Sequence, residues 1–298
     1  MMNKMRTLLL SIILIVVLSS NGFTQISDPQ IAFFAEHEGG LHIFDFDSGK
    51  IDRLDVGMSN VGNLDFHSGK KLLVFEGSNG HHVPRSLYIY DFKSQKVEKI
   101  YKSTSYDDVI YRPKFHPNGE HLFAVNYNNG IFIYSFSKKT WNKVKVDGNS
   151  RYHAKGISFS RTGNKVAIST GSSWGFLIAE VENDRFTVKD FILEEFRSCT
   201  SARWQDDNTI IFAGRKKPGR QYVWKYSIDD KDLIQLTNDP VGARDFLTLS
   251  KDGKTVVFTG TDKNFEWRLW KISSNGNDLQ KLTHGGNLSS HLSPVWIE

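Results

Sequence analysis

Cysteine is nearly absent from this sequence, because its 298 residues include only one, Cys199. A single cysteine excludes an intrachain disulfide, so packing has to hold the fold together. We interpret Cys199 as a small buried residue rather than a nucleophile, a role that would need a His and an Asn or Asp beside it. Hydrophobic residues make up 39% of the chain, which is enough for a sizeable core.

Strong charge and familiar catalytic motifs are also missing. The sequence has no His-Glu-x-x-His and no glycine-rich phosphate loop. The net charge is +5, and it falls to +3 without Lys4 and Arg6, since residues 1–25 hold no acid. So mild a charge does not favour nucleic acid as a partner. We therefore expect no cofactor, and a binding protein more than an enzyme.

The N-terminus resembles an export signal. Lys4 and Arg6 precede an apolar run of 11 residues, 8–18, and small and polar residues follow. This run is short for a membrane-spanning helix, which needs about 20 residues. We expect a signal peptide over residues 1–24, cut near residues 22–24, and a periplasmic or secreted protein without a transmembrane anchor. An uncleaved anchor is the alternative; no cysteine lies near the cut to carry a lipid.

A repeat of about 45 residues organises the rest of the chain. Each copy begins with an aromatic or apolar anchor, a tight turn and an apolar strand, as in residues 249–258 (LSKDGKTVVF). An aromatic third strand and a more polar fourth strand follow, for example residues 87–90 and 97–100. Four short strands per repeat are typical of a propeller blade. The anchors, 49, 44, 45, 45 and 47 residues apart, are Phe66, Phe115, Phe159, Trp204, Leu249 and Trp296.

The two ends of the chain complete the repeat. Residues 31–34, 41–46 and 51–54 match the second, third and fourth strands of a blade that has no first strand, and residues 296–298 match a first strand with nothing after it. We expect the C-terminal strand to join the N-terminal blade, because this closes the ring and leaves no long exposed edge. The prediction is an all-β, six-bladed β-propeller of four-stranded antiparallel blades, in one domain over residues 28–298.

Several copies resemble the propeller repeat of the TolB family, which reads roughly Phe-Ser-Pro-Asp-Gly-x-x-Ile-x-Phe. Residues 115–119 (FHPNG) and 249–258 match it, residues 87–91 match its Ile-Tyr-x-x-Asp strand, and residues 236–237 its Leu-Thr ending. The resemblance implies architecture more than function, since the repeat occurs in scaffolds, peptidase propellers and some lyases. The resemblance also implies an α/β domain before the propeller; we expect the propeller alone here, and therefore no full TolB role.

The longest loops should open on one face of the ring, the long-loop face, where binding usually occurs. The first strands of the blades should bring cations and hydrogen-bonding groups to the channel mouth on that face, able to capture a carboxylate or an acidic peptide. We expect the partner to be an envelope or extracellular protein or peptide, with a small glycan possible. The predicted channel-mouth residues are Asn60, Arg112, His153, Lys155, Arg203, Arg244, Asp245 and His291. The predicted long-loop residues are His81, His82, Trp174, Arg215, Lys216 and Trp267.

Two alternatives stay open on this face. The first is an enzyme on oligosaccharides, with a funnel of histidines that binds a metal; without fixed ligand spacing we expect no metal. The second concerns the basic loop 215–220, which is either a solvated hairpin tip or a site for an anionic glycan or lipid headgroup. A purely structural accessory of a larger complex is a further possibility. The histidines of the funnel would be His37, His81, His82, His153, His284 and His291.

Overall fold

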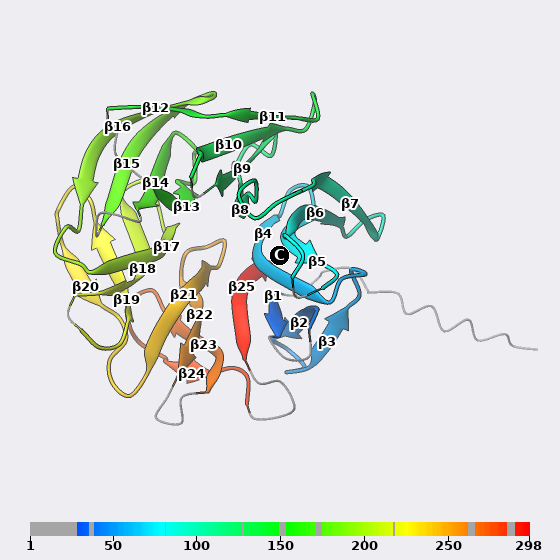
Figure 1. Ribbon diagram of the computed structural model, residues 1–298. Helices are drawn as coiled ribbons and strands as arrows, with labels where there is room; N and C mark the ends of the chain where they lie inside the picture. Colours follow the sequence, from blue (N-terminus) through cyan, green and yellow to red (C-terminus); the bar gives the residue numbers. More distant parts are fainter. Residues whose placement is uncertain are drawn as a thin grey trace, which may run out of the picture.

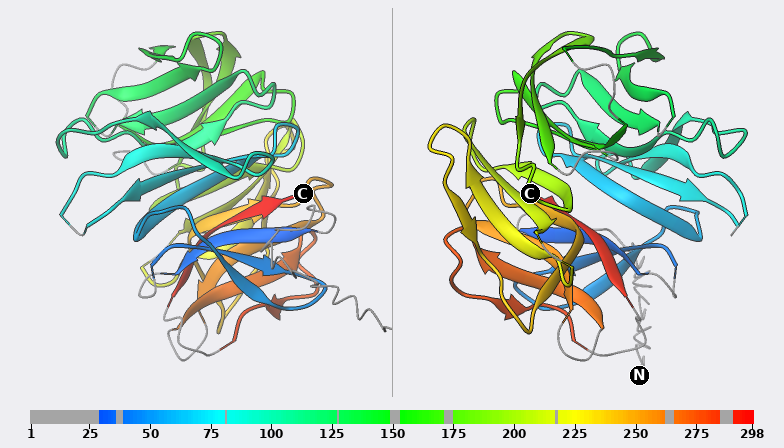
Figure 2. Two further views of the ribbon diagram at one scale, coloured as in Figure 1. Left: turned by 90° about the vertical axis from the view of Figure 1, so that its right-hand side faces the viewer. Right: turned by 60° about the vertical axis from the view of Figure 1, so that its left-hand side comes forward.

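The computed structural model describes residues 29–35, 39–80, 82–126, 128–148, 153–170, 175–216, 218–261, 266–284 and 290–298. These residues form 25 strands in six sheets, set around a central axis as the blades of a propeller (Figures 1 and 2). The predicted fold class is therefore confirmed. Within this described part, no helix has the length and apolarity to cross a membrane. The expected signal peptide, residues 1–24, lies outside it.

The blades follow one another along the chain, and each runs from an inner strand at the axis to an outer strand at the rim. From inner to outer they are β25 (His291–Ile297), β1 (Gln30–Ala35), β2 (Leu41–Asp45), β3 (Ile51–Leu54); β4 (Asn60–His67), β5 (Leu72–Ser78), β6 (Ser86–Asp91), β7 (Lys96–Tyr101); β8 (Tyr111–Phe115), β9 (His121–Asn126), β10 (Gly130–Ser135), β11 (Thr140–Lys143); β13 (Ala154–Phe159), β14 (Lys165–Thr170), β15 (Phe176–Glu182), β16 (Arg185–Ile192), with β12 (Lys145–Asp147) outside; β17 (Ser198–Trp204), β18 (Thr209–Arg215), β19 (Tyr222–Ser227), β20 (Leu233–Gln235); and β21 (Gly242–Leu249), β22 (Thr255–Thr261), β23 (Trp267–Ser273), β24 (Gln280–Lys281). We number them blades one to six in this order.

The ring closes by pairing the two ends of the described chain. Strand β25 runs antiparallel to β1, with Ile31 opposite Trp296 and Gln30 opposite Ile297. Figure 1 shows this red strand beside the blue β1. Ile31 and Ile297 are fully buried. Each inner strand also contacts the inner strand of the next blade, and β21 of blade six contacts β25. The predicted closure of the first blade by the C-terminal strand is confirmed.

One blade differs from the expected four strands. The sequence predicts the outer strand of blade three at residues 143–146, but β11 ends at Lys143 and the chain crosses to blade four. The Val144 side chain is buried, and its N–H donates to the Ile131 carbonyl at 2.8 Å. The next N–H, of Lys145, donates instead to Asp184 O at 2.9 Å, and β12 then pairs with β16 in parallel. Blade four therefore has five strands.

The turns between first and second strands form the face opposite the long loops, which we call the short-turn face. On it, side chains of one blade bond to the turn of the next. His116 Nε2 donates to Gly163 O at 3.0 Å, and Gln205 Nε2 donates to Gly253 O at 3.1 Å. A Cβ on Gly163 would lie 2.5 Å from the His116 ring, and this glycine has a φ of +80°. The turn thus needs glycine both for its backbone conformation and for the close approach of its neighbour.

Candidate functional site

All six inner strands are irregular at the same level of the channel. In each, the pairing with the second strand shifts register, as a β-bulge does, and a bulge redirects the side chains that it carries. The shifts lie between Gly62 and Asp65, Tyr111 and Lys114, Ala154 and Gly156, Thr200 and Arg203, and Ala243 and Leu247, and, in β25, opposite Ala32–Phe34 of β1.

Four of these bulges place a residue other than glycine in the left-handed region. The φ angles are +41° at Asn63, +52° at Arg112, +51° at Ser201 and +52° at Ser293. Such conformations are uncommon outside glycine and cost of order 1–3 kcal/mol each. The four residues occupy equivalent places in blades two, three, five and one. The same left-handed conformation therefore recurs around the channel and is not a peculiarity of one strand.

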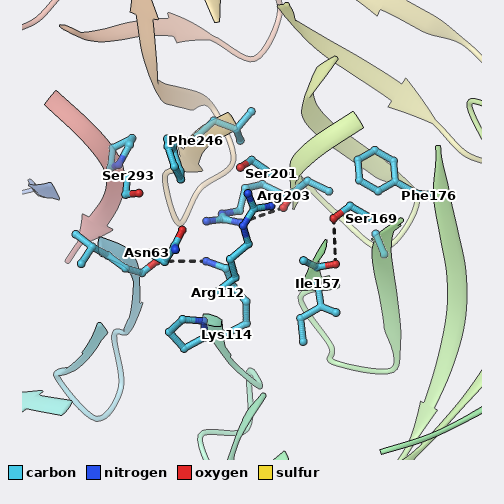
Figure 3. Close-up of a pocket in the computed structure, with 17 residues that line it drawn as sticks. Asn63, Arg112, Lys114, Ile157, Ser169, Phe176, Ser201, Arg203, Phe246 and Ser293 are labelled. Atoms are coloured by element: carbon cyan, nitrogen blue, oxygen red, sulfur yellow. Dashed lines mark hydrogen bonds between the residues drawn. The ribbon is translucent and has the colours of Figure 1, made fainter. Parts of the chain in front are cut away.

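The bulges surround a small cavity, the channel cavity, with a volume of about 50 Å³. Figure 3 shows Arg112, Lys114 and Arg203 extending toward its centre. A cavity of this size holds a few water molecules or one small ion, since a single water needs roughly 10–15 Å³. The other labelled lining residues are Asn63, Ile157, Ser169, Phe176, Ser201, Phe246 and Ser293.

The cavity wall is rich in cations. Lys114 Nζ lies 2.7 Å from Asp65 Oδ1, whose second oxygen accepts the N–H of Phe115 at 2.8 Å. Burial, and then the charge of Arg203, lower the pKa of Lys114 to about 8. Burial also lowers the pKa of Arg203. These shifts mark positive charges that are held close together in a poorly solvated place.

A buried glutamate behind this wall fixes two of the bulges. Glu76 is 3% exposed, and its Oε1 accepts bonds of 2.7 Å from Asn63 Nδ2 and from the N–H of Arg112. Its other oxygen lies 3.6 Å from Arg85 Nη1. Burial raises the pKa of the Glu76 carboxyl, and the backbone bond from Arg112 and the charge of Arg85 oppose that rise. Glu76 is thus a positioning residue, which aims Asn63 and Arg112 at the channel.

The structure brings some predicted channel-mouth residues to the cavity. Arg112 and Arg203 line it, and Lys155 lies on the β13 bulge beside the lining residue Gly156. On the β21 bulge, the guanidinium of Arg244 lies 5.1 Å from the ring centre of Trp267. A predicted channel-mouth residue and a predicted long-loop residue are thus in contact.

Other predicted residues have different surroundings. Asn60 Oδ1 accepts a bond of 2.6 Å from Arg85, so this side chain belongs to the Glu76 cluster. His291 is 1% exposed, and its Nδ1 lies 2.7 Å from Thr283 Oγ1. Burial lowers the pKa of His291 to about 4. Placing His291 at the channel mouth was wrong, because the side chain points into the core between blades six and one.

The predicted funnel of histidines does not gather in the described part of the chain. His82, His153 and His284 are exposed and His291 is buried, and no three His, Cys, Asp or Glu side chains among the described residues are grouped as metal ligands would be. His37, His81 and Trp174 lie outside the described residues, and the side chain of Asp245 is not described either.

The basic loop 215–220 packs against its own blade. Lys216 Nζ lies 5.1 Å and 5.4 Å from the ring centres of Phe196 and Trp224, and 3.4 Å from Glu195. Arg220 donates to the carbonyl of Pro240. These contacts border an open groove of about 580 Å³ at the rim of blade five. Lys216 and Arg220 are therefore anchored to the blade, unlike the cations of a solvated hairpin tip.

One motif escaped the sequence interpretation. Residues 171–175 (GSSWG) have the spacing Gly-x-Ser-x-Gly, which marks a nucleophile where a strand turns into a helix. Here the segment joins β14 to β15, two antiparallel neighbours of one blade. The strand-to-helix context of the motif is thus missing, and residues 171–174 lie outside the described part of the chain.

Comparisons with known proteins agree with this architecture. Residues 160–294 match the family model described as the dipeptidyl peptidase IV (DPP IV) N-terminal region. A search of curated protein sequences finds no match. Among solved structures, TolB from Acinetobacter baumannii has 17% identity and a TM-score of 0.71 over 90% of this chain and 66% of that one.

Two further structures show the same fold at greater distance. A candidate TolB from Agrobacterium tumefaciens has 14% identity and a TM-score of 0.62, covering 86% of this chain and 88% of that chain. An oligogalacturonate lyase in complex with manganese has 12% identity and a TM-score of 0.55, with 89% of this chain and 75% of that one covered. The protein is thus a TolB-like propeller in fold. Because it spans only 66% of the Acinetobacter TolB chain, the activity of that whole protein does not transfer with the fold.

Proposed function

We propose that this protein is an exported, non-catalytic propeller that binds an acidic segment of a protein or peptide across its long-loop face and channel mouth. The observation that carries the proposal is the presence of four cations on four neighbouring inner strands. Each lies on, or next to, the bulge of its strand. They are Arg112 on β8, Lys155 on β13, Arg203 on β17 and Arg244 on β21.

This arrangement suits carboxylates better than other ligands. Arginine presents a planar fork of donors that pairs with a carboxylate through two bonds, and such bonds are stronger than neutral ones. Arg112, Lys155, Arg203 and Arg244 are all partly exposed, so a segment lying across the mouth can reach them. The narrow cavity beneath admits one small group and not a folded chain, so the partner must lie mainly on the surface.

The expected location supports the same proposal. The N-terminal residues have the charge and apolar run of an export signal, and the fold is similar to that of a protein named TolB. We therefore propose that the partner is an envelope or extracellular protein or peptide. A lyase-like function has less support, because the histidines that it would use are dispersed among the described residues.

The proposal is tested by measuring the binding of a fluorescent, Asp- and Glu-rich peptide by anisotropy at low and moderate salt. We expect saturable binding that weakens with salt and that drops about tenfold in the double variant Lys155→Gln, Arg244→Gln, since two partly exposed charge pairs together contribute roughly 1–2 kcal/mol. The matched control Lys251→Gln, Lys254→Gln removes the same charge from the short-turn face and should bind like the native protein. Equal loss in both variants would contradict a site at the channel mouth.

Affinity capture from envelope extract then asks which protein carries the acidic segment. A captured protein should be lost from the Lys155→Gln, Arg244→Gln variant and kept by the control. Unsaturated products formed from uronate-containing oligosaccharides would overturn the non-catalytic part of the proposal.

A further inference from the structure

We propose that the channel cavity is a binding site for one small oxyanion of the phosphate or sulfate class, held by Arg112, Lys114 and Arg203. This site shares Arg112 and Arg203 with the channel mouth at which the acidic partner is proposed to bind. Its measurements with phosphate do not depend on that partner.

The first observation is a charge imbalance around the cavity. The wall and the cluster behind it hold four cations and two carboxylates. Both oxygens of Asp65 are occupied, by Lys114 and by the N–H of Phe115, and Glu76 is engaged by Arg85, Asn63 and the N–H of Arg112. The sum is an excess of two positive charges. The cations are Arg85, Arg112, Lys114 and Arg203.

The two arginines facing the cavity carry that excess. Among the described side chains, neither guanidinium forms an ion pair with a carboxylate, and Arg203 Nη1 donates only to the carbonyl of Ala202, at 3.1 Å. Cations taken out of water without a partner are unfavourable. Burial lowers the pKa of Lys114 and of Arg203, and the charge of Arg203 adds to the lowering at Lys114. An anion between them would relieve both effects.

A second, independent observation is a buried hydroxyl without a partner. Ser293 is 4% exposed and lines the cavity, yet its Oγ makes no hydrogen bond. Its backbone is held in the left-handed region, with a φ of +52°. Figure 3 shows this side chain on the far side of the cavity from Ser169 and Phe176. A buried hydroxyl that lacks a partner is destabilising, whereas one that donates to an anion is not.

The dimensions and chemistry select the class of ligand. The cavity of about 50 Å³ accepts one oxyanion of the size of phosphate or sulfate, but no peptide or sugar. Guanidinium and ammonium groups from β8 and β17 face it, as is typical of oxyanion sites. A metal cation is disfavoured, because the carboxylates nearby are already engaged. The same donors also suit a carboxylate at the tip of a bound partner, so the experiment must separate these two sources.

The test is thermal unfolding and isothermal titration calorimetry of the whole protein in a zwitterionic buffer, at constant ionic strength, with sodium phosphate replacing sodium chloride. We expect the melting temperature to rise and then saturate, with one phosphate bound per chain. Binding should weaken about tenfold or more in Arg203→Gln and in Ser293→Ala. The Lys251→Gln variant, on the short-turn face, should bind phosphate as the native protein does.

Phosphate and sulfate also stabilise proteins by exclusion from their surface, without saturation and regardless of the variant. An unsaturable rise that is equal in native protein and Ser293→Ala would therefore overturn the site. If Arg203→Gln fails to fold, phosphate binding by Arg112→Lys is compared with that of the native protein instead. A selenate soak gives a direct readout, with anomalous density expected between the two arginines; its absence together with no calorimetric binding would also overturn the site.

Adding the acidic peptide to the titration identifies the source of the anion. Competition between peptide and phosphate would support a site that takes the partner's carboxylate, and simultaneous binding would support a site for the free anion. If the peptide does not bind at all, the proposed partner fails while the phosphate measurements still stand by themselves.

Discussion

The two ends of the inner strands use the same backbone conformation for different purposes. On the short-turn face, φ is positive at glycines such as Gly119 and Gly163, with values of +70° and +80°. At the channel, φ is positive at Asn63, Arg112 and Ser201, which have side chains. Where a neighbouring blade lies too close for a Cβ, the chain has glycine. Where a side chain must point into the channel, the chain has kept the side chain despite its backbone strain.

This difference separates architecture from function. The short turns repeat from blade to blade and bond to one another, so their residues serve the ring. The bulges repeat as backbone, but the side chains on them differ, being Asn, Arg, Lys and Ser in different blades. Strain of about 1–3 kcal/mol at each left-handed residue persists only when the surroundings hold it in place, as Glu76 does for Asn63 and Arg112. We infer that the bulges are retained for the groups that they present.

The largest expected effect comes from breaking a turn. Gly163→Ala adds a Cβ 2.5 Å from the His116 ring, at a φ of +80°. Left-handed strain and overpacking together should lower the free energy of unfolding by about 3 kcal/mol. Urea denaturation measures the change.

Gly49→Ala is the matched control for that substitution. Gly49 has a similar φ of +67°, but nothing lies within 4 Å of the position of its Cβ. It should lose only about 1 kcal/mol, from backbone strain. Equal losses in the two variants would show that the contact between blades does not constrain the turn.

The fold was predictable because its signals are periodic. The predicted anchors Phe115, Phe159 and Leu249 are each the last residue of an inner strand, next to the tight turn that follows. The bulges were not predictable, because one or two extra residues in a strand scarcely alter a pattern of alternating apolar residues. The passage of the chain from blade three to blade four at Val144 was not predicted either, since an apolar residue in a polar stretch fits the outer strand of either blade.

The candidate site was predictable only in outline. The cations at strand entries could be found from the repeat, and so Arg112, Arg203 and Lys155 were singled out. Glu76 and Ser293 were missed, although Glu76 has a visible signal: an acid that directly follows the apolar residues 72–75 inside a strand. His291 was misplaced because the sequence does not show which face of β25 packs against the next blade.

A smaller effect is expected from Lys114 in the channel, which should make the free energy of unfolding depend on pH. The pKa of Lys114 is about 8 in the folded protein and 10.5 ordinarily, so the native state releases this proton first as pH rises. Below about pH 8 both states are protonated; above it, unfolding takes up a proton, and the free energy of unfolding rises until about pH 10.5. We expect a gain on the order of 2 kcal/mol between about pH 7 and pH 9.5 relative to Lys114→Met, which lacks the titrating group.

Urea denaturation of both proteins across this range, in buffer free of oxyanions, gives the difference. Parallel pH profiles for the native protein and Lys114→Met would mean that Lys114 is not buried among like charges. Adding phosphate should flatten the native profile if the channel cavity binds it, because an anion favours the protonated lysine.

The smallest expected change in stability lies at the channel mouth itself. Lys155 is on a bulge and partly exposed, and its side chain serves no turn or blade core. Lys155→Gln should therefore change the free energy of unfolding by less than about 0.5 kcal/mol, while lowering the affinity for the acidic peptide severalfold. Lys155→Arg keeps the charge and should restore binding. A variant that loses stability and binding together would instead place Lys155 with the architecture, and the division between the two ends of the inner strands would no longer hold.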